Sequence, residues 1–471
     1  MRVLTLILAL LLATPAMAAR FDELFHDKTM RVDYFHTGGK GQEIVALDRV
    51  VSDGPWPGSR TRLADTSNLG KYLFEVIDRS TNQLIYSRGF ASIYSEWETT
   101  GEAKSTSSTF HESLRFPWPK NPVQVVLKKR DGDNAFQQIW STLIDPASRF
   151  VNPADVMPAG RVFTIFENGP ASQKVDLLII GEGYTEAELP KFQADIKRLA
   201  GKLFATEPFK SRQRDFNVRA LHLASPRSGV HRPRTGDNRR TLTGTQYNIF
   251  DSERYVLTLD NRSLREVASS APYDFLEILV NEKQYGGGGI FNDQATSSVD
   301  SGFSEYVFVH EFGHHFAGLA DEYYTSDVAF DTGGSDHPEP WEENVTALHD
   351  PAKLKWRDLV DKDTPIPTPW KKEEFEEHQR AFQAERRKLR AENAPESEMD
   401  KLFRRELEYE TKFLGSEKYA GKVGAFEGAA YEAKGLYRPQ ADCIMFTRDE
   451  VGFCRVCSRA IERIIDQYSR Q

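Results

Sequence analysis

Apolar and polar positions alternate along the first third of the chain in a way that predicts β-structure. Between residues 31 and 144, short apolar stretches (44–51, 72–78, 83–90, 112–119 and 122–131) are separated by Gly, Pro, Asp and Asn. Alternation with a period of two indicates strands with one buried face, and strands at this spacing predict a β-sandwich. We assign this all-β domain to residues 19–155, because the next stretch, 152–160 (NPADVMPAG), is rich in proline and glycine.

The pattern changes after residue 160. Residues 175–180 form a continuous apolar run, which predicts a buried strand, and residues 217–224 and 274–281 predict two more. Thr185 and Glu188 have the spacing of a capping box, so a helix is expected to follow to about residue 204. Strands that alternate with helices predict a mixed sheet, and we assign residues 160–471 to this α+β domain.

Residues 371–413 differ from the rest of the second domain. They carry dense charges with apolar residues at helical spacing, and the pattern breaks at Ala394-Pro395. This predicts a helical hairpin with charged, solvent-exposed faces, inserted into the second domain.

His310, Glu311 and His314 form an H-E-x-x-H motif in an apolar context, SEYVFVHEFGHHFAGLA. A helix turns about 100° per residue, so the two histidines share one face, one turn apart. Two imidazoles in this arrangement bind Zn²⁺, and Glu311 lies beside them, placed to take a proton from an attacking water. The motif therefore predicts a catalytic site with one Zn²⁺ per chain. His315 points about 100° away from His314, which favours a structural or supporting role over ligation.

A zinc hydrolase needs a third protein ligand and an open fourth position. Gly318 follows the motif and can end the helix with a positive φ, turning the chain back toward the metal. Metzincins place a histidine after such a turn, whereas this chain offers Asp321 and Glu322, with the glycine one position later. We predict Asp321 as the third ligand, with Glu322 as the alternative and His337 as a more distant one.

Met445 lies near the C-terminus in the stretch 442–446 (DCIMF). Together with the long motif H-E-F-G-H-x-F-A-G-L-A-D-E-Y, it resembles the IgA-peptidase family of zinc metalloendopeptidases, a metzincin-like group. Similar stretches begin at Val175 (VDLLIIGEGYTEAE), Tyr285 (YGGGGIFN) and Gly435 (GLYRPQADCIMF), so the resemblance covers about residues 160–465. It implies a metzincin-like zinc peptidase domain with an active-site helix, a Met-turn at Met445 beneath the metal ligands, and a separate all-β N-terminal domain.

The glycine run YGGGGIFN precedes the histidine motif and reads as the edge of a sheet. Exposed backbone groups at such an edge pair with an extended peptide, so we hypothesise that Gly288, Gly289, Ile290 and Phe291 hydrogen-bond the substrate; the alternative is a plain loop. Tyr437 and Tyr324 are candidates for stabilising the oxyanion, because both lie near the motifs in the sequence.

Three cysteines, Cys443, Cys454 and Cys457, cluster near the C-terminus. In an exported protein they predict one disulfide, between Cys443 and either Cys454 or Cys457, with one thiol left over. Redox chemistry or a zinc site at the C-x-x-C pair is disfavoured, because a second cysteine pair is absent.

The first eighteen residues predict export. A short positive start, an apolar core at 4–13 and a small-x-small signal ending at Ala18 describe a signal peptide, residues 1–18. The apolar run is too short for a membrane span, and we expect the mature protein in the periplasm or secreted.

The net charge of −9 argues against nucleic-acid binding. The patterns together predict an exported zinc-dependent endopeptidase that hydrolyses peptide bonds in extended protein segments. Two alternatives remain: a zinc exopeptidase or amidase acting on cell-wall peptides, and a non-catalytic adhesion or glycan-binding protein. The intact Glu311 disfavours the last of these.

Overall fold

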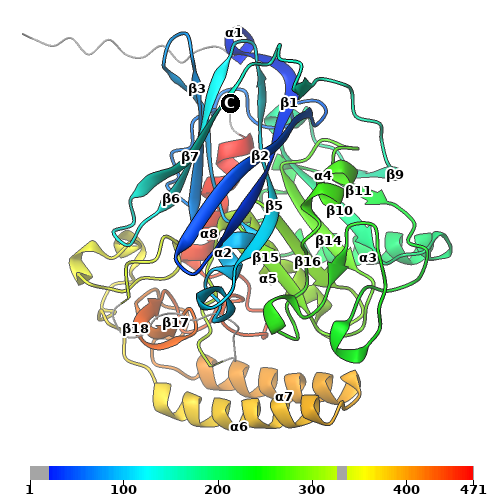
Figure 1. Cartoon of the computed structure of the whole chain (residues 1–471). Coiled ribbons are helices and arrows are strands. Elements are labelled where there is room, and N and C mark those ends of the chain that lie inside the picture. Colours follow the sequence, from blue (N-terminus) through cyan, green and yellow to red (C-terminus); the bar gives the residue numbers. More distant parts are fainter. Residues whose placement is uncertain (1–20, 326–336, 470–471) are drawn as a thin grey trace, which may run out of the picture.

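Two four-stranded sheets make up the N-terminal part of the chain (Figure 1). This computed structural model describes residues 21–325 and 337–469, and the predicted signal peptide, residues 1–18, lies outside them. The first sheet has the order β5-β1-β2-β8, with strands Ser108–Pro119, Phe25–Gly39, Gln42–Ser52 and Val151–Asn152. The second has the order β4-β3-β6-β7, with strands Leu84–Phe90, Tyr72–Asp78, Val123–Arg130 and Phe136–Ile144.

The alternating pattern of the sequence becomes the buried interior between these sheets. Along β3, buried and half-buried residues alternate without exception. The ring of Phe116, on the first sheet, lies 6.2 Å from Phe74 and 6.4 Å from Tyr86, which belong to the second. The two sheets therefore pack face to face, as in a β-sandwich. Two short helices, α1 (Phe21–Leu24) and α2 (Ile93–Trp97), accompany them.

A six-stranded mixed sheet forms the centre of the second part. Its order is β15-β16-β14-β10-β11-β9, with strands Gly287–Ile290, Gln294–Ser298, Phe275–Val280, Val175–Glu182, Phe216–His222 and Arg161–Phe166. The four central strands are parallel, whereas the two edge strands, β15 and β9, run antiparallel to their neighbours. The two strands at the centre, β10 and β14, are buried along their whole length, which explains their largely apolar sequences.

Helices cover both faces of this sheet. On one face, Leu177 and Ile179 share a core with α3 (Leu189–Leu203), α5 (Ser304–Ala317) and α8 (Arg455–Ser469). On the other face, Leu178 and Ile180 pack with α4 (Asn261–Ala268). The small strands β12 (Thr245–Gln246) and β13 (Leu257–Thr258) pair nearby. The predicted capping box is present, because the carboxylate of Glu188 accepts the N–H of Thr185 at 2.9 Å.

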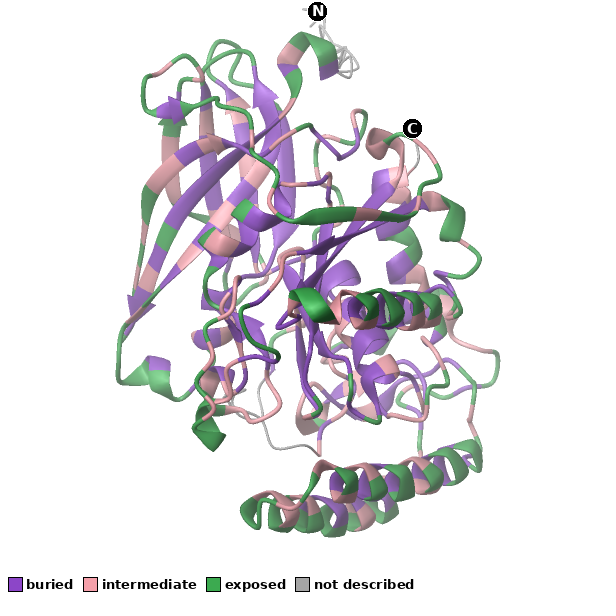
Figure 2. Cartoon of the chain, turned by 90° about the vertical axis from the view of Figure 1, so that its right-hand side faces the viewer, coloured by how far each residue is buried: buried purple, intermediate pink, exposed green. Residues whose placement is uncertain are grey.

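The charged segment forms a hairpin of two helices, α6 (Lys372–Ala391) and α7 (Glu396–Gly415), as the sequence predicts. Phe403 on its inner side lies 5.1 Å from the ring of Tyr285, and Arg390 forms an ion pair with Glu253 at 2.6 Å. Figure 2 shows the largely exposed outer surface of the hairpin. A two-stranded sheet, β17 (Phe426–Ala429) and β18 (Glu432–Arg438), follows it. Within the described ranges, no helix has the length and apolar character needed to cross a membrane.

Candidate active site

The histidine motif lies on α5, which packs against β15 and β16. The helix ends at Gly318, whose φ of 59° lies in the left-handed region, and its N–H donates to the carbonyl of His314 at 2.9 Å. Glycine adopts this conformation without steric cost, so the chain reverses here and returns along the helix. This reversal brings Asp321 back to the two histidines.

Three donor atoms converge at this point. Oδ1 of Asp321 lies 3.0 Å from Nε2 of His310 and 3.1 Å from Nε2 of His314, and the two Nε2 atoms are 3.1 Å apart. A tetrahedral zinc ion with bonds of about 2.0 Å holds its donor atoms about 3.3 Å apart. The spacing of the three side chains therefore fits a metal ion of this kind.

The opposite nitrogens of both rings are held by backbone carbonyls. Nδ1 of His310 donates to the carbonyl of Ile444 at 2.9 Å, and Nδ1 of His314 donates to the carbonyl of Leu319. A carbonyl only accepts, so the proton of each neutral ring is fixed on Nδ1 and the Nε2 lone pair faces Asp321. Both imidazoles are thus oriented as ligands.

Glu311 lies at the wall of a cavity of about 570 Å³, which His314 and Asp321 also line. Burial raises the pKa of Glu311 above its ordinary value. The N-terminal sandwich contributes part of the wall through Ala91 and Glu96, among others. Burial raises the pKa of Glu96 to about 7, and its carboxylate accepts the hydroxyl of Tyr255 at 3.1 Å.

Tyr431 is a residue of this site that the sequence did not indicate. Its hydroxyl donates to Oδ2 of Asp321, on the side opposite the histidines, and lies 3.4 Å from the hydroxyl of Tyr323. Ala430 and Tyr431 form the turn between β17 and β18 with φ values of 47° and 66°. Neither is the Asn or Gly that usually marks such a turn, so the sequence carried no signal for it.

Comparison with known families agrees with this geometry. A family described as IgA Peptidase M64 matches residues 163–465, and the family described as Peptidase M64 N-terminus matches residues 20–141. The chain belongs to the IgA Peptidase M64 family. Its members are metallopeptidases, so the resemblance seen in the sequence is confirmed and the substrate is a protein or peptide. No curated protein matches the chain.

Met445 of this peptidase lies in a tight turn beneath the histidine helix. The carbonyl of Cys443 accepts the N–H of Phe446 at 2.8 Å and that of Thr447 at 3.0 Å. Met445 is fully buried, and its sulfur is 3.1 Å from where a Cβ on Gly313 would stand. The turn therefore lies directly under the helical turn that separates His310 from His314.

The structure places Glu322, the alternative third ligand, away from the two histidines and among the three cysteines. Neighbouring side chains of this segment face opposite ways, so that Asp321 meets the histidines while Glu322 turns into the protein. Its Oε1 lies 3.2 Å from Sγ of Cys457 and accepts from Asn344 at 3.0 Å. His337 lines the cavity but is not part of the histidine and aspartate cluster.

The structure does not form the predicted disulfide between Cys443 and either Cys454 or Cys457. All three cysteines are free thiols, and Sγ of Cys443 and Sγ of Cys457 are 3.9 Å apart, whereas a disulfide bond is about 2.05 Å long. The C-x-x-C pair and Cys443 instead surround Glu322.

The glycine run forms the edge strand β15. Its backbone hydrogen bonds limit which of the residues Gly288 to Phe291 have backbone groups left for a peptide. Gly288 and Ile290 pair with β16, and the carbonyl of Phe291 accepts from Ala91 at 2.9 Å. Gly287 already donates to the carbonyl of Arg254 on its outer side. Alternation along an antiparallel pair turns the backbone groups of Gly289 away from β16, and Gly289 lines the cavity. The backbone groups of Gly287 that face outward are already bonded to Arg254 and Val256.

The glycines also allow a close approach to α5. A Cβ on Gly289 would lie 2.3 Å from the carbonyl oxygen of Glu311, and a Cβ on Gly287 would lie 2.9 Å from Cγ of the same residue. His315 joins this contact: its Nδ1 donates to Ile290 and its Nε2 accepts from Leu276. These hydrogen bonds tie α5 to β15 and β14, which agrees with the structural role expected for His315.

The two tyrosines chosen for the oxyanion lie elsewhere. Tyr437 is on β18, where its backbone pairs with Thr346, and Tyr324 stacks on Phe446 with ring centroids 6.4 Å apart. Neither lines the cavity. Nearness in sequence was misleading here, because Tyr437 lies further along β18, away from the turn that holds Tyr431, which does reach the site.

Proposed function

We propose that the chain is an exported zinc-dependent endopeptidase that cleaves extended protein segments. The observation that carries this proposal is the convergence of His310, His314 and Asp321 at the wall of a cavity beside Glu311. Two imidazoles and one carboxylate, with room for a fourth ligand, are the donor set of many catalytic zinc sites. Bound zinc supplies Lewis acidity and makes a water nucleophilic at neutral pH.

The chain's own residues supply the proton transfer. Glu311 is the general base: it takes the proton of the attacking water and passes it to the leaving amine. Tyr431 holds the second oxygen of Asp321 and thereby fixes the direction of the first toward the histidines. In place of Tyr437 and Tyr324, which do not line the cavity, we propose that the phenol of Tyr431 stabilises the developing charge.

The edge strand β15 supports the proposal that the substrate is an extended peptide. An extended peptide entering the cavity can exchange backbone hydrogen bonds with Gly289, continuing the sheet beyond β15. The neighbouring position is closed by Arg254 and Val256, which already pair with Gly287. Side chains of the sandwich, including Glu96, face the same cavity and are placed to contact the substrate.

Export rests on the signal peptide predicted at residues 1–18. Mass determination of the N-terminus of protein recovered outside the cytoplasm tests it. The account expects a start near residue 19, whereas an intact Met1 on an active protein would contradict it.

Mapping the cuts made in a mixed peptide library by mass spectrometry tests the activity. Internal cuts are expected with the native protein and are expected to disappear with Glu311→Ala. Glu305→Ala is the matched control, because Glu305 lies on the same helix but faces Arg198 at 3.7 Å. Cuts that persist in Glu311→Ala would contradict the assigned base, and terminal trimming alone would favour the exopeptidase.

A further inference from the structure

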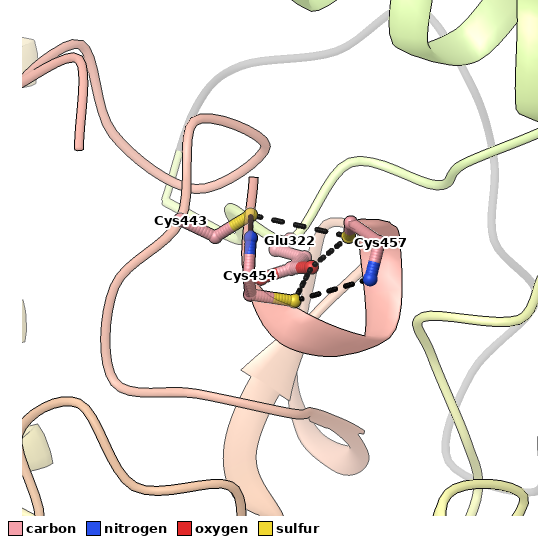
Figure 3. A group of neighbouring side chains, drawn as sticks. All are labelled: Glu322, Cys443, Cys454 and Cys457. Carbon is pink, nitrogen blue, oxygen red and sulfur yellow. Dashed lines mark hydrogen bonds between the residues drawn. The ribbon is translucent and has the colours of Figure 1, made fainter. Parts of the chain in front are cut away.

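A second cluster of metal-ligating side chains lies behind the active site. It consists of Glu322, Cys443, Cys454 and Cys457, called here the cysteine cluster (Figure 3). The four residues come from three parts of the chain: the irregular segment that follows α5, the turn of Met445, and the start of α8. All four are buried, and one donor atom from each lies within 4.8 Å of the others.

The spacing of these atoms is that of a tetrahedral zinc site. Zinc–sulfur bonds of about 2.3 Å place two sulfurs about 3.8 Å apart, and a zinc–oxygen bond of about 2.0 Å places sulfur and oxygen about 3.5 Å apart. Sγ of Cys443 and Sγ of Cys457 are 3.9 Å apart. Oε1 of Glu322 lies 3.2 Å from the sulfur of Cys457 and 4.0 Å from that of Cys454.

Backbone N–H groups point at the sulfurs, as they do where thiolates carry charge. Sγ of Cys443 accepts from the N–H of Cys454 at 3.2 Å and from that of Met445 at 3.5 Å. Sγ of Cys454 accepts from the N–H of Cys457 at 3.4 Å. Cys454 and Cys457 also stand at the N-terminal end of α8, where the helix dipole favours negative charge.

Glu322 supplies an independent sign that a ligand is expected. The residue is fully buried; Oε1 accepts from Asn344, but Oε2 finds no hydrogen-bond partner among the residues that the structure describes. Burial of a carboxyl group without a partner is costly, and a metal ion removes that cost.

We propose that the cysteine cluster binds one zinc ion as a closed structural site. Three sulfurs favour zinc over hard cations, and zinc accepts carboxylate oxygen as a fourth ligand. Binding replaces the protons of the thiols with the metal, so protons are released as it forms. Four protein ligands leave no open position, which distinguishes this site from the one at His310. With this site, we expect two zinc ions per chain, whereas the sequence predicts one.

The second site stabilises the geometry of the first, a consequence that rests on the proposed function. Glu322 directly follows Asp321, and Cys443 directly precedes Ile444, whose carbonyl orients His310. One ion therefore fixes both the segment that carries the third ligand and the turn that carries Met445. We assign Glu322 and the three cysteines as positioning residues.

Zinc content measured by elemental mass spectrometry on the purified full chain tests the proposal. Two ions per chain are expected for the native protein and one for the double variant His310→Ala/His314→Ala, which leaves the cysteine cluster intact. Cys457→Ser is expected to lose the other ion, whereas Ser458→Ala, one residue further on, is expected to keep both. An absence of zinc in the double variant, or another metal in its place, would overturn the proposal.

A second measurement covers the case in which Cys457→Ser does not fold. The double histidine variant is loaded with Co²⁺, and the intense near-ultraviolet absorption of cobalt bound to thiolates is expected. Alkylation of the denatured native protein is expected to modify all three cysteines, whereas alkylation of only one would reveal a disulfide and overturn the site. The cobalt spectrum and the alkylation both report on the cysteine cluster alone. Their results therefore test this site even if Glu311→Ala remains active and the proposed function fails.

Discussion

The histidine cluster and the cysteine cluster take one acid each from the same short segment, but only the histidine cluster borders a cavity. Asp321 joins two histidines at the wall of a cavity, and His314 keeps 14% of its side chain exposed. Glu322, the next residue, joins three cysteines that are buried within the core. Consecutive acids thus belong to two different clusters, one at the wall of a cavity and one within the core.

The difference between the two clusters follows from their donor atoms and access. Two imidazoles and one carboxylate leave room for a water or substrate, which catalysis requires. Three thiols and one carboxylate complete a tetrahedron, which suits a structural ion. A closed site next to an open one holds the ligands of the open one in place without entering the reaction.

Chelation provides the largest expected contrast between the clusters. A chelator reaches the open site directly, so turnover is expected to be lost completely while the protein stays folded. The ion in the cysteine cluster is expected to leave much later, together with a fall in the melting temperature. Following turnover, zinc content and circular dichroism over time checks this order, and simultaneous loss of both ions would contradict it.

Glu311→Gln sharpens the role of the open cluster. The amide cannot accept the proton of the attacking water, so kcat is expected to fall about 10²–10⁴-fold. The zinc content is expected to stay unchanged, because Glu311 is not one of the converging donors. Steady-state kinetics with metal analysis measures both, and native turnover would contradict the mechanism.

Tyr431→Phe tests the support of Asp321. The variant removes only the hydroxyl that donates to Oδ2 of Asp321. Loss of such a supporting bond is expected to weaken metal affinity at the open site about 10–100-fold, with the cysteine cluster unaffected. Metal competition titration measures the effect, and unchanged affinity and turnover would show that Tyr431 has no part in the site.

Gly289→Ala tests the close contact between β15 and the histidine helix. Its Cβ would stand 2.3 Å from the carbonyl oxygen of Glu311, so the variant is expected to lose about 1–3 kcal/mol of stability and to turn over substrate more slowly. Gly201→Ala is the matched control: it lies within α3 with open space around its Cβ, and a gain of about 0.5–1 kcal/mol is expected. Equal denaturation midpoints for the two variants would contradict the contact.

The N-terminal sandwich holds a buried cluster of His36, Glu43 and Glu112, in which the protonated imidazole of His36 pairs with the two carboxylates. Burial alone would lower the pKa of His36, but the carboxylates of Glu112 and Glu43 raise it to about 9, above the ordinary 6.5. The stabilisation is complete below pH 6.5 and lost as the pH rises through 9. A decrease of about 1–2 kcal/mol is expected over this range. Unfolding curves at several pH values measure it, and the same pH slope in His36→Gln would contradict it.

The sequence predicted those parts of the fold and site that depend on local pattern. The period of β3, the capping box at Thr185, the helix of His310 and its end at Gly318 all follow from a few neighbouring residues. Each reflects backbone geometry or a single helical turn, which the chain specifies without distant contacts.

The remaining features depend on residues that are far apart in the chain. Tyr431 reaches Asp321 from 110 positions away, through a turn whose residues give no turn signal. Glu322 joins Cys457 across 135 positions, so three cysteines without a second pair read as a disulfide and a spare thiol. Only tertiary packing determines which of two adjacent acids faces the histidines.

X-ray diffraction recorded on both sides of the zinc absorption edge tests the central claim most directly. The account predicts two anomalous peaks: one among His310, His314 and Asp321, the other among Glu322 and the three cysteines. A single peak at the histidines, with a disulfide in place of the second, would contradict the two-site account. Absence of the peak at the histidines would contradict the proposed catalytic centre itself.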